Sequence, residues 1–189
     1  MSKDYITGLQ AEIDWLSRVI EARVKDEGAD FEAIAPPELP AGSVLADFIS
    51  ENQLSPAERL LLILVLVPHL YPVFLHKKTS ETPISHLPPH LSKGEFQKYH
   101  FGVVKSPTSD SFLPTGQTFL YLVAGQHLGL RAEHIGHIYQ NRYTLVSRDI
   151  IKPVQNNGYD PILSNILAIS QQYVLAFTLN QSSFLPESS

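Results

Sequence analysis

The eight histidines are the side chains of this sequence best suited to holding a metal ion. His134 and His137 lie three residues apart in an expected helix, where they could share one face, and His86 and His90 flank a pair of prolines. Zinc proteases need the pattern His-Glu-x-x-His, and structural zinc sites usually also use cysteine. The chain has neither, so we expect these histidines to pack or to lie at the surface, without a metal.

The sequence motifs of nucleotide and nucleophile chemistry are also absent. There is no Gly-x-x-x-x-Gly-Lys-Ser/Thr phosphate loop, no Gly-x-Gly-x-x-Gly and no Gly-x-Ser-x-Gly. The lack of cysteine excludes a thiol nucleophile, an iron–sulfur site and a disulfide scaffold. The carboxylates near the N-terminus fall on expected helix surfaces and in proline-rich connectors, where a solvated charge is usual. We therefore assign no catalytic residue, cofactor or metal to this chain.

Charge is distributed unevenly along the 189 residues, whose formal net charge is −5. Residues 1–60 hold five basic and twelve acidic side chains, a balance of −7, and the remainder holds nine basic and seven acidic, a balance of +2. This asymmetry indicates two functional surfaces. Charged residues make up only 17%, below the roughly 25% of an average soluble domain, so we expect a partner to cover part of the surface.

Length and hydropathy predict one folded domain with a helical extension. Hydrophobic residues make up 43%, which is enough for a core. The longest apolar run, residues 60–67, has eight residues, whereas a membrane span needs about 20. The N-terminus also lacks the layout of a signal peptide. We expect a cytoplasmic protein without a membrane span.

The first predicted element is an amphipathic helix over residues 3–27, within an N-terminal extension of residues 1–34. Its apolar residues recur at alternating steps of three and four and form a narrow seam, which consists of Ile6, Leu9, Ile13, Leu16 and Ile20. Gly28 can end the helix in the left-handed conformation. Two alternatives stay open: the seam packs on its own domain, or it pairs with another chain in a homo-oligomer.

A proline-rich connector at 35–42 leads into the predicted domain, residues 43–179. Ser43 caps a short helix. The stretch Ser55-Pro-Ala-Glu58 is a capping box with proline at the first helical position. The helix that it starts is apolar on nearly all faces to about residue 67, so we expect it at the centre of the core.

The middle of the chain is rich in helix breakers. Pro68 should end or kink the central helix, and a shorter helix is expected over roughly 69–77. Residues 78–111 contain six prolines and glycines that interrupt regular structure, and they predict a long exposed loop. One short strand is expected within it, at 101–104.

The C-terminal half predicts two helices followed by a small hairpin. Thr115 caps a helix that Gly125 closes, and another helix is expected over 130–140. Residues 144–154 alternate and are rich in β-branched side chains, which favours a strand. After a turn at 156–158, residues 162–169 fit either a helix or a second strand.

The order of these elements is that of a winged helix. The pair of helices over 115–124 and 129–140 would be its helix-turn-helix, and the hairpin would be its wing. Ser170 caps a last helix to about Thr178, and residues 180–189 resemble the start of a linker. We therefore predict a mainly α winged-helix fold with an N-terminal helical extension.

Winged helices often bind DNA, and four basic residues lie where such contacts would occur. Arg131 begins the would-be recognition helix, Arg142 follows it, and Arg148 and Lys152 lie on the predicted wing strand. The helix itself is mainly apolar, and so little basic surface would release few counterions. The sequence makes nucleic-acid binding the weaker alternative: a DNA-binding regulator that dimerises through its N-terminal helix.

Several stretches resemble a known family. They are residues 54–70, 101–105, 112–118 with Ala124-Gly125, and 170–173, of which Phe112-Leu-Pro-Thr-Gly116 is the most specific. Over about residues 50–180 the chain resembles the N-terminal winged-helix region of bacterial AAA+ ATPases of the Bacteroidetes type, some of them associated with contractile injection systems. The resemblance implies a full-length bacterial protein with a following AAA+ module that binds ATP and magnesium and assembles into a ring.

Motifs and resemblance together predict a non-catalytic adaptor domain. It would recognise a partner or substrate, or position the ATPase ring, and its protein partners would include an AAA+ module in the same full-length chain. The expected contact surfaces are the N-terminal seam and the wing around Arg148 and Lys152, with Arg131 and Arg142 as further candidates.

Overall fold

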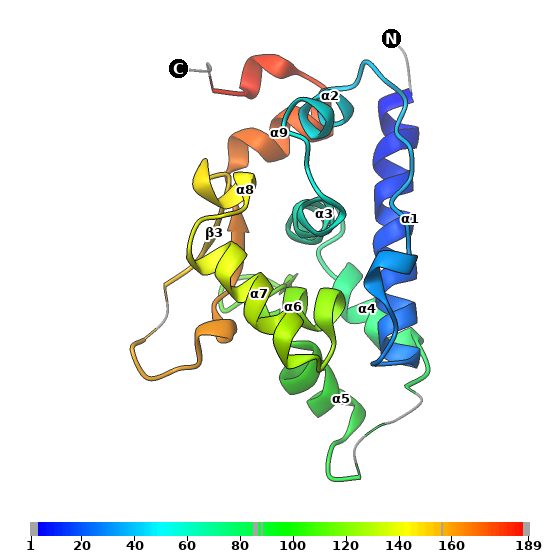
Figure 1. Ribbon diagram of the computed structural model, residues 1–189, viewed down its shortest axis with the longest axis vertical. Coiled ribbons are helices and arrows are strands. Elements are labelled where there is room, and N and C mark those ends of the chain that lie inside the picture. The colour runs from blue at the N-terminus through cyan, green and yellow to red at the C-terminus, as the bar shows by residue number, and fades with distance from the viewer. Residues whose placement is uncertain (1–3, 85–86, 88, 156, 187–189) are drawn as a thin grey trace.

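The computed structural model describes residues 4–84, 87, 89–155 and 157–186, and it is mainly helical (Figure 1). Short two-stranded sheets complete it. The helical elements are α1 (Asp4–Lys25), η1 (Phe31–Ala33), α2 (Val44–Glu51), α3 (Pro56–Leu70), α4 (Phe74–Glu81), α5 (Lys93–Glu95), η2 (Phe96–Phe101), α6 (Gly116–Ala124), α7 (Leu128–Tyr139), α8 (Thr144–Ser147), η3 (Ile162–Ser164), α9 (Gln171–Leu179) and η4 (Ser182–Phe184).

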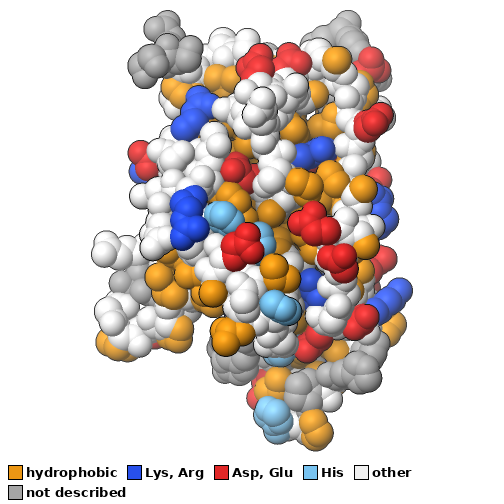
Figure 2. Space-filling view, viewed as in Figure 1, with side chains coloured by type: hydrophobic (Ala, Val, Ile, Leu, Met, Phe, Trp, Pro, Cys, Tyr) orange, Lys and Arg blue, Asp and Glu red, His pale blue; other side chains and the backbone are white. Residues whose placement is uncertain are grey.

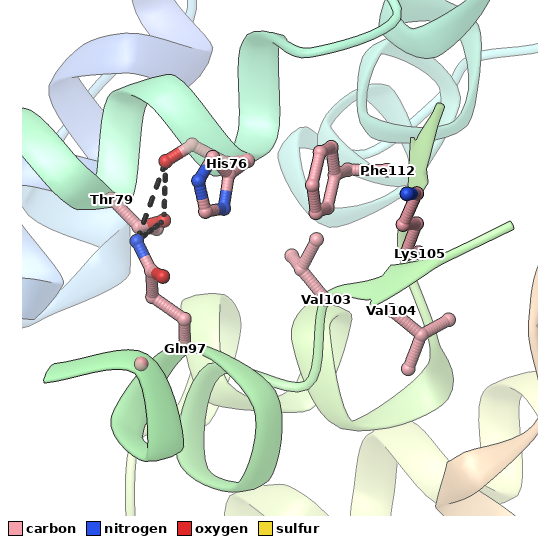
Figure 3. A pocket seen from close by; sticks show the side chains of 8 residues that line it. His76, Thr79, Gln97, Val103, Val104, Lys105 and Phe112 are labelled. Atoms are coloured by element: carbon pink, nitrogen blue, oxygen red, sulfur yellow. Dashed lines mark hydrogen bonds between the residues drawn. The ribbon is translucent and has the colours of Figure 1, made fainter. Parts of the chain in front are cut away.

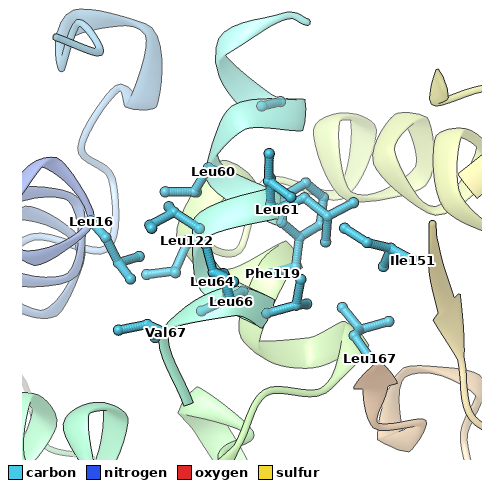
Figure 4. Packing of buried hydrophobic residues seen from close by; sticks show 14 of the residues in the cluster. Leu16, Leu60, Leu61, Leu64, Leu66, Val67, Phe119, Leu122, Ile151 and Leu167 are labelled. Atoms are coloured by element: carbon cyan, nitrogen blue, oxygen red, sulfur yellow. The ribbon is translucent and has the colours of Figure 1, made fainter. Parts of the chain in front are cut away.

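Helix α3 lies at the centre of the fold, and the other helices surround it (Figure 1). Every residue from Leu60 to Val67 is at most 2% exposed, which confirms the predicted central helix. Leu16 of α1 packs on one side of α3, and Ile151 and Leu167 of the second sheet lie on the other side (Figure 4). Burial of each such leucine or isoleucine is worth about 1.5–3 kcal/mol, so this cluster dominates the stability of the fold.

The start of α3 follows the prediction in its N-cap and its proline, but the reciprocal half of the capping box does not form, since the Glu58 side chain binds the Thr144 amide. The end of α3 also differs from the prediction. Ser55 Oγ accepts a hydrogen bond from the Glu58 amide at 3.2 Å, and Pro56 occupies the first turn. The helix runs past Pro68 to Leu70, and the next helix begins at Phe74 with a bend of 106° between the two axes. Among the described residues no single helix is long and apolar enough to cross a membrane; only the bent pair α3 and α4 passes such a test jointly.

The predicted loop at 78–111 is largely wrong. Helix α4 extends to Glu81, and a second helical segment, α5 followed by the π-helical turn η2, occupies 93–101. Ser92 and Glu95 form a reciprocal capping box at its start. Phe96 and Phe101 are 1% and 0% exposed, because this segment packs its aromatic side chains into the core.

Both small sheets are antiparallel hairpins. In the first, β1 (Val104–Lys105) pairs with β2 (Phe112–Leu113), so only the end of the strand expected at 101–104 forms. In the second, β3 (Ile151–Pro153) pairs with β4 (Leu167–Ile169) in the register Ile151 to Ile169. The strand predicted at 144–154 is therefore wrong in its first half, which forms α8, and the ambiguous segment 162–169 contains both η3 and β4.

The ends of two helices differ in how they use glycine. Helix α6 ends at Gly125, as predicted, with a φ of +56° and a ψ of −123°, a backbone conformation that L side chains rarely adopt, and a Cβ at this position would lie 2.4 Å from the Glu27 carbonyl oxygen. Helix α1 ends at Lys25, before Gly28, and Gly28 is not left-handed, contrary to the prediction. Instead, Arg23 donates to the carbonyl oxygens of Glu27 and Ala29 and holds this turn.

The C-terminal helix α9 begins after Ser170, as expected, but the Ser170 side chain makes no capping hydrogen bond, contrary to the prediction. The helix ends at Leu179, followed by Asn180 in the left-handed conformation. The Asn180 side chain accepts a hydrogen bond from the Val44 amide at 2.8 Å, which ties α9 to the start of α2. Helix η4 follows, and Leu185 packs against the hydrophobic core. The described part of the predicted linker at 180–189 is therefore attached to the domain; residues 187–189 lie outside the described residues.

Candidate functional site

A pocket of about 430 Å³ lies between α4, the α5–η2 segment and the first hairpin (Figure 3). On its polar side, the Gln97 amide nitrogen donates to Thr79 Oγ1 at 3.0 Å and to Ser80 Oγ at 2.8 Å. On the other side, the His76 ring stacks on Phe112, with ring centroids 4.3 Å apart and planes 16° apart. This pair offers a flat surface that a planar or apolar group could contact.

The chemistry available in this pocket is limited. Its titratable groups among the described lining residues are His76 and Lys105, and Lys105 pairs with Asp110 at 3.4 Å. No carboxylate is among those lining residues, so the pocket lacks the acid and base pair that hydrolysis or proton transfer needs. The Gln97 amide serves instead to hold η2 against α4.

A second polar cluster joins the end of α1 to η2 and α6. His100 Nε2 lies 2.5 Å from Glu27 Oε1, and the Tyr121 hydroxyl donates to the same oxygen at 3.2 Å. The Gln126 side chain reaches His100 Nε2 at 3.1 Å. Burial raises the pKa of Tyr121, and the nearby Glu27 carboxylate raises it further. The hydroxyl therefore stays protonated and can donate a hydrogen bond.

A carboxylate beside an imidazole is also the arrangement of a general base, which would need a hydroxyl nucleophile within hydrogen-bond distance of the ring. None of the described hydrogen bonds of the His100 ring joins it to a serine or threonine, and its Nε2 is held by Glu27. The Gln117 side chain binds the His100 carbonyl oxygen at 2.7 Å, which fixes η2 to α6. The cluster therefore acts as a joint between three elements.

An apolar groove of about 460 Å³ lies where the connection between β3 and β4 meets β1, the start of α6 and α7. Ile135 of α7, Val104 of β1 and the segment 161–164 form most of its wall. The Tyr139 hydroxyl donates to the Ile162 carbonyl oxygen at 3.0 Å and holds this segment against α7, while the Ile162 side chain is 49% exposed. Hydrophobic side chains also gather at the lower left of Figure 2, over the connection between β3 and β4.

The predicted N-terminal seam is mostly buried within the chain. Leu9, Ile13, Leu16 and Ile20 are 7%, 5%, 0% and 0% exposed, because α1 packs on α2, α3, α4 and α6. Ile6 alone remains accessible, at 48%. The structure therefore supports packing on the same chain, one of the two alternatives, and these four residues present no free surface to a partner.

Each of the four candidate nucleic-acid contacts has a partner in the chain. Arg131 donates to the Gly125 carbonyl oxygen and to Gln117 Oε1, at 2.9 and 2.5 Å, and its burial lowers the pKa of its guanidinium. The other three contacts are Arg142 with Gln140 Oε1, Arg148 with Asn52 Oδ1 at 2.6 Å, and Lys152 with Asp149 at 3.7 Å. The Arg148 guanidinium also lies over the Phe48 ring. The part-buried Arg131 links α7 to the two ends of α6, whereas the Lys152 pair is exposed on both sides and adds little stability.

The paired histidines of α7 do share a face, as their spacing predicts. The rings of His134 and His137 are 5.6 Å apart, and His134 Nδ1 lies 2.6 Å from the Tyr143 hydroxyl. Burial lowers the pKa of His134 and raises that of Tyr143. Within the described residues, no group of three or more histidines, carboxylates or cysteines is placed to hold a metal ion. His86, named above, lies outside them.

Sequence reasoning missed the polar joints because their members are distant in the chain. Glu27 lies in the turn after α1, His100 in η2 and Tyr121 in α6, and the sequence predicts a loop where η2 forms. The signal that could have identified that element is Ser92-Lys-Gly-Glu95, a capping box before two spaced phenylalanines. Comparison with protein-family models, with curated proteins and with solved structures found no match to this chain.

Proposed function

We propose that this chain is the non-catalytic adaptor domain of a bacterial cytoplasmic AAA+ ATPase, and that it binds a protein partner or substrate. The observation that carries the proposal is the apolar groove. It is open to solvent and bordered by the half-exposed Ile162, whereas the polar clusters described above are engaged in holding elements together. An open apolar groove beside satisfied polar clusters suits binding rather than catalysis.

Two further features support the proposal. Residues 112–118 resemble the corresponding AAA+ family segment, and they build the turn before α6, with Thr115 as its N-cap. Helices α6 and α7 are followed by the short helix α8 and then by the β3–β4 hairpin, an order close to that of a winged helix, and we infer that this hairpin is the wing. The groove lies between the wing and α7, so an apolar side chain of the partner would enter there.

The first test is the reading frame downstream of Ser189. An in-frame module with Gly-x-x-x-x-Gly-Lys-Ser/Thr supports the proposal, and a stop codon at that point contradicts it. In the full-length protein, deletion of residues 1–186, which removes α1 together with the helices on which its seam packs, should leave basal ATP hydrolysis within about twofold while abolishing any stimulation by substrate, because an adaptor acts before the chemical step. Loss of basal hydrolysis in an intact ring would contradict an adaptor role.

A further inference from the structure

One polar atom of the buried Gln97 side chain has no partner among the described residues. Gln97 is 9% exposed and lines the pocket between α4, the α5–η2 segment and the first hairpin. Its amide nitrogen lies 3.0 Å from Thr79 Oγ1, 2.8 Å from Ser80 Oγ and 3.4 Å from the His76 carbonyl oxygen. None of the described residues donates a hydrogen bond to its oxygen, Oε1. Buried polar atoms are normally paired, so this acceptor needs an explanation.

The surroundings of this amide fix its orientation. The Thr79 hydroxyl donates to the Leu75 carbonyl oxygen at 2.9 Å, and the Ser80 hydroxyl donates to the His76 carbonyl oxygen at 2.8 Å. Both hydroxyls therefore meet Gln97 as acceptors, and a carbonyl oxygen can only accept. The amide nitrogen must face all three groups, which belong to α4, and Oε1 is turned away from α4 toward the pocket (Figure 3).

The rest of the pocket combines an apolar wall with one positive charge at its edge. Phe112, stacked with His76, and Val104 form part of the wall. Lys105 lines the pocket with a side chain that is 61% exposed, and its ion pair with Asp110 is exposed on both sides. Such a pair is weak, so the ammonium group is available to an anion. The volume of about 430 Å³ is within the range of roughly 300–1,000 Å³ that small-molecule sites have.

We propose that this pocket binds a small planar heteroaromatic carboxylate whose ring carries an N–H group, of the indole type. The ring N–H donates to Gln97 Oε1, the ring packs on the apolar wall, and the carboxylate faces Lys105. No carboxylate is among the described lining residues, so a cationic donor would meet Lys105 without a counter-charge. One lysine balances a monoanion, whereas a phosphate group usually meets an arginine fork or a helix N-terminus.

Binding in this pocket goes beyond the proposed adaptor function and does not depend on it. Among their described lining residues, the pocket and the apolar groove share only Val104. The pocket is formed by α4, the α5–η2 segment and the first hairpin, whereas the groove involves α7 and the connection between β3 and β4. Failure of either proposal therefore leaves the other intact.

The test is titration of the 189-residue chain with indole-3-acetate, followed by nuclear magnetic resonance of the side-chain amide groups. We expect saturable binding with a dissociation constant of about 0.1–1 mM, as suits a ligand of this size, and a shift of the Gln97 amide signals. Benzofuran-3-acetate has nearly the same shape and charge, but an oxygen atom replaces the ring N–H. It should bind about tenfold more weakly, because it leaves Oε1 unpaired. This comparison changes the ligand and leaves the protein, and hence its folding, untouched.

Two lysine variants test the other end of the ligand. Lys105→Gln should weaken the binding of indole-3-acetate about two- to fivefold, since an exposed ion pair is worth no more. Lys77→Gln removes a lysine of α4 that is 69% exposed and is not among the described lining residues, and it should leave the affinity unchanged. The neutral indole-3-acetamide should bind the wild type and Lys105→Gln equally. Equal affinity of the two lysine variants for indole-3-acetate would contradict the assignment of a carboxylate.

Four further outcomes would overturn the proposal. The first is the absence of a saturable response to indole-3-acetate up to about 5 mM. The second is equal affinity for benzofuran-3-acetate, since Oε1 would then not accept the hydrogen bond. The third is tighter binding of adenosine monophosphate than of indole-3-acetate, which would assign the pocket to a nucleotide. The fourth is a response at Ile135 and Leu163 without one at Gln97, which would place the ligand in the apolar groove.

Discussion

Glu58 Oε1 accepts a hydrogen bond from the Thr144 amide at 3.0 Å, across 86 positions of sequence. Glu58 is the third residue of α3, and its side chain would complete a capping box by turning back to the Ser55 amide. It reaches the first turn of α8 instead, where backbone amides have no partner within the helix. Glu58 thus connects the starts of α3 and α8. This contact explains why residues 144–147 form a helix, although the alternating sequence pattern predicts a strand there.

Replacement of Glu58 by alanine should destabilise the protein. The first turn of α8 would lose its acceptor, and loss of a helix cap costs about 0.5–2 kcal/mol of the free energy of unfolding. Glu58→Gln keeps a carbonyl oxygen in place and should cost less. Urea denaturation measures both, with the exposed Glu51→Ala as the matched control. Equal stability of Glu58→Ala and Glu51→Ala would show that the contact does not support α8.

The same carboxylate should give a pH dependence of stability. Burial raises the pKa of Glu58 above its ordinary value of 4.5, although the α8 amides partly offset the effect. The folded protein then binds more protons than the unfolded chain above pH 4.5. The unfolding free energy of the wild type, relative to Glu58→Gln, should therefore be greatest below pH 4.5 and fall as the pH rises to the folded pKa, then level off.

Denaturation of the two proteins in parallel at several pH values measures this difference, since other titrating groups, such as the buried Glu12, are common to both and cancel. A difference that instead grows with pH in favour of the wild type would mean that Glu58 has a lowered pKa, and that the cap outweighs the burial.

The elements that the sequence predicts well are those fixed by local signals. Ser43, Ser55 and Thr115 each cap the helix expected of them, because a cap needs only residues within one turn. Gly125 ends α6 for the same reason. The core position of α3 also follows from its composition, since a helix that is apolar on nearly all faces must be buried.

The elements that were predicted wrongly depend on contacts distant in the chain. Residues 144–147 become helical where Glu58 supplies a cap from another helix, and periodicity within the segment cannot reveal that. The turn after α1 is held by Arg23, which is 3% exposed and binds the Leu122 carbonyl oxygen of α6. Arg23 is buried and donates hydrogen bonds to three carbonyl oxygens. Hydropathy patterns count an arginine as a surface charge, so they cannot predict this role.

The joint at Glu27 should contribute measurably to stability. Glu27→Ala would leave the hydroxyl of Tyr121, a fully buried side chain, without its acceptor, which costs about 1–3 kcal/mol. Tyr121→Phe removes the hydroxyl itself and should cost less. A double-mutant cycle of the two changes should show coupling, because they share one hydrogen bond. Strict additivity in chemical denaturation would contradict the joint.

The seam of α1 should behave as core. Leu16 is fully buried, so Leu16→Glu places an unpaired charge inside the protein and should cost more than about 4 kcal/mol or prevent folding. Ile6→Glu, at the accessible end of the same seam, should change the unfolding free energy by less than about 0.5 kcal/mol. Circular dichroism with thermal denaturation separates the two. A folded Leu16→Glu protein that merely loses self-association would restore the intermolecular alternative for the seam.

The DNA-binding alternative is decided by an assay at low salt. Non-specific affinity for duplex DNA appears first at low ionic strength and rises with the number of phosphates that the protein neutralises. Arg131 and Arg148 are held by hydrogen bonds to α6 and α2, and Lys152 pairs with Asp149, so few cations are free to meet phosphates. We therefore expect no binding of a random duplex by the wild type at about 50 mM salt, measured by fluorescence anisotropy. Tight binding that weakens with added salt and is lost on Arg142→Ala would favour the regulator instead, because that arginine would then have to leave Gln140 to contact the backbone of the DNA.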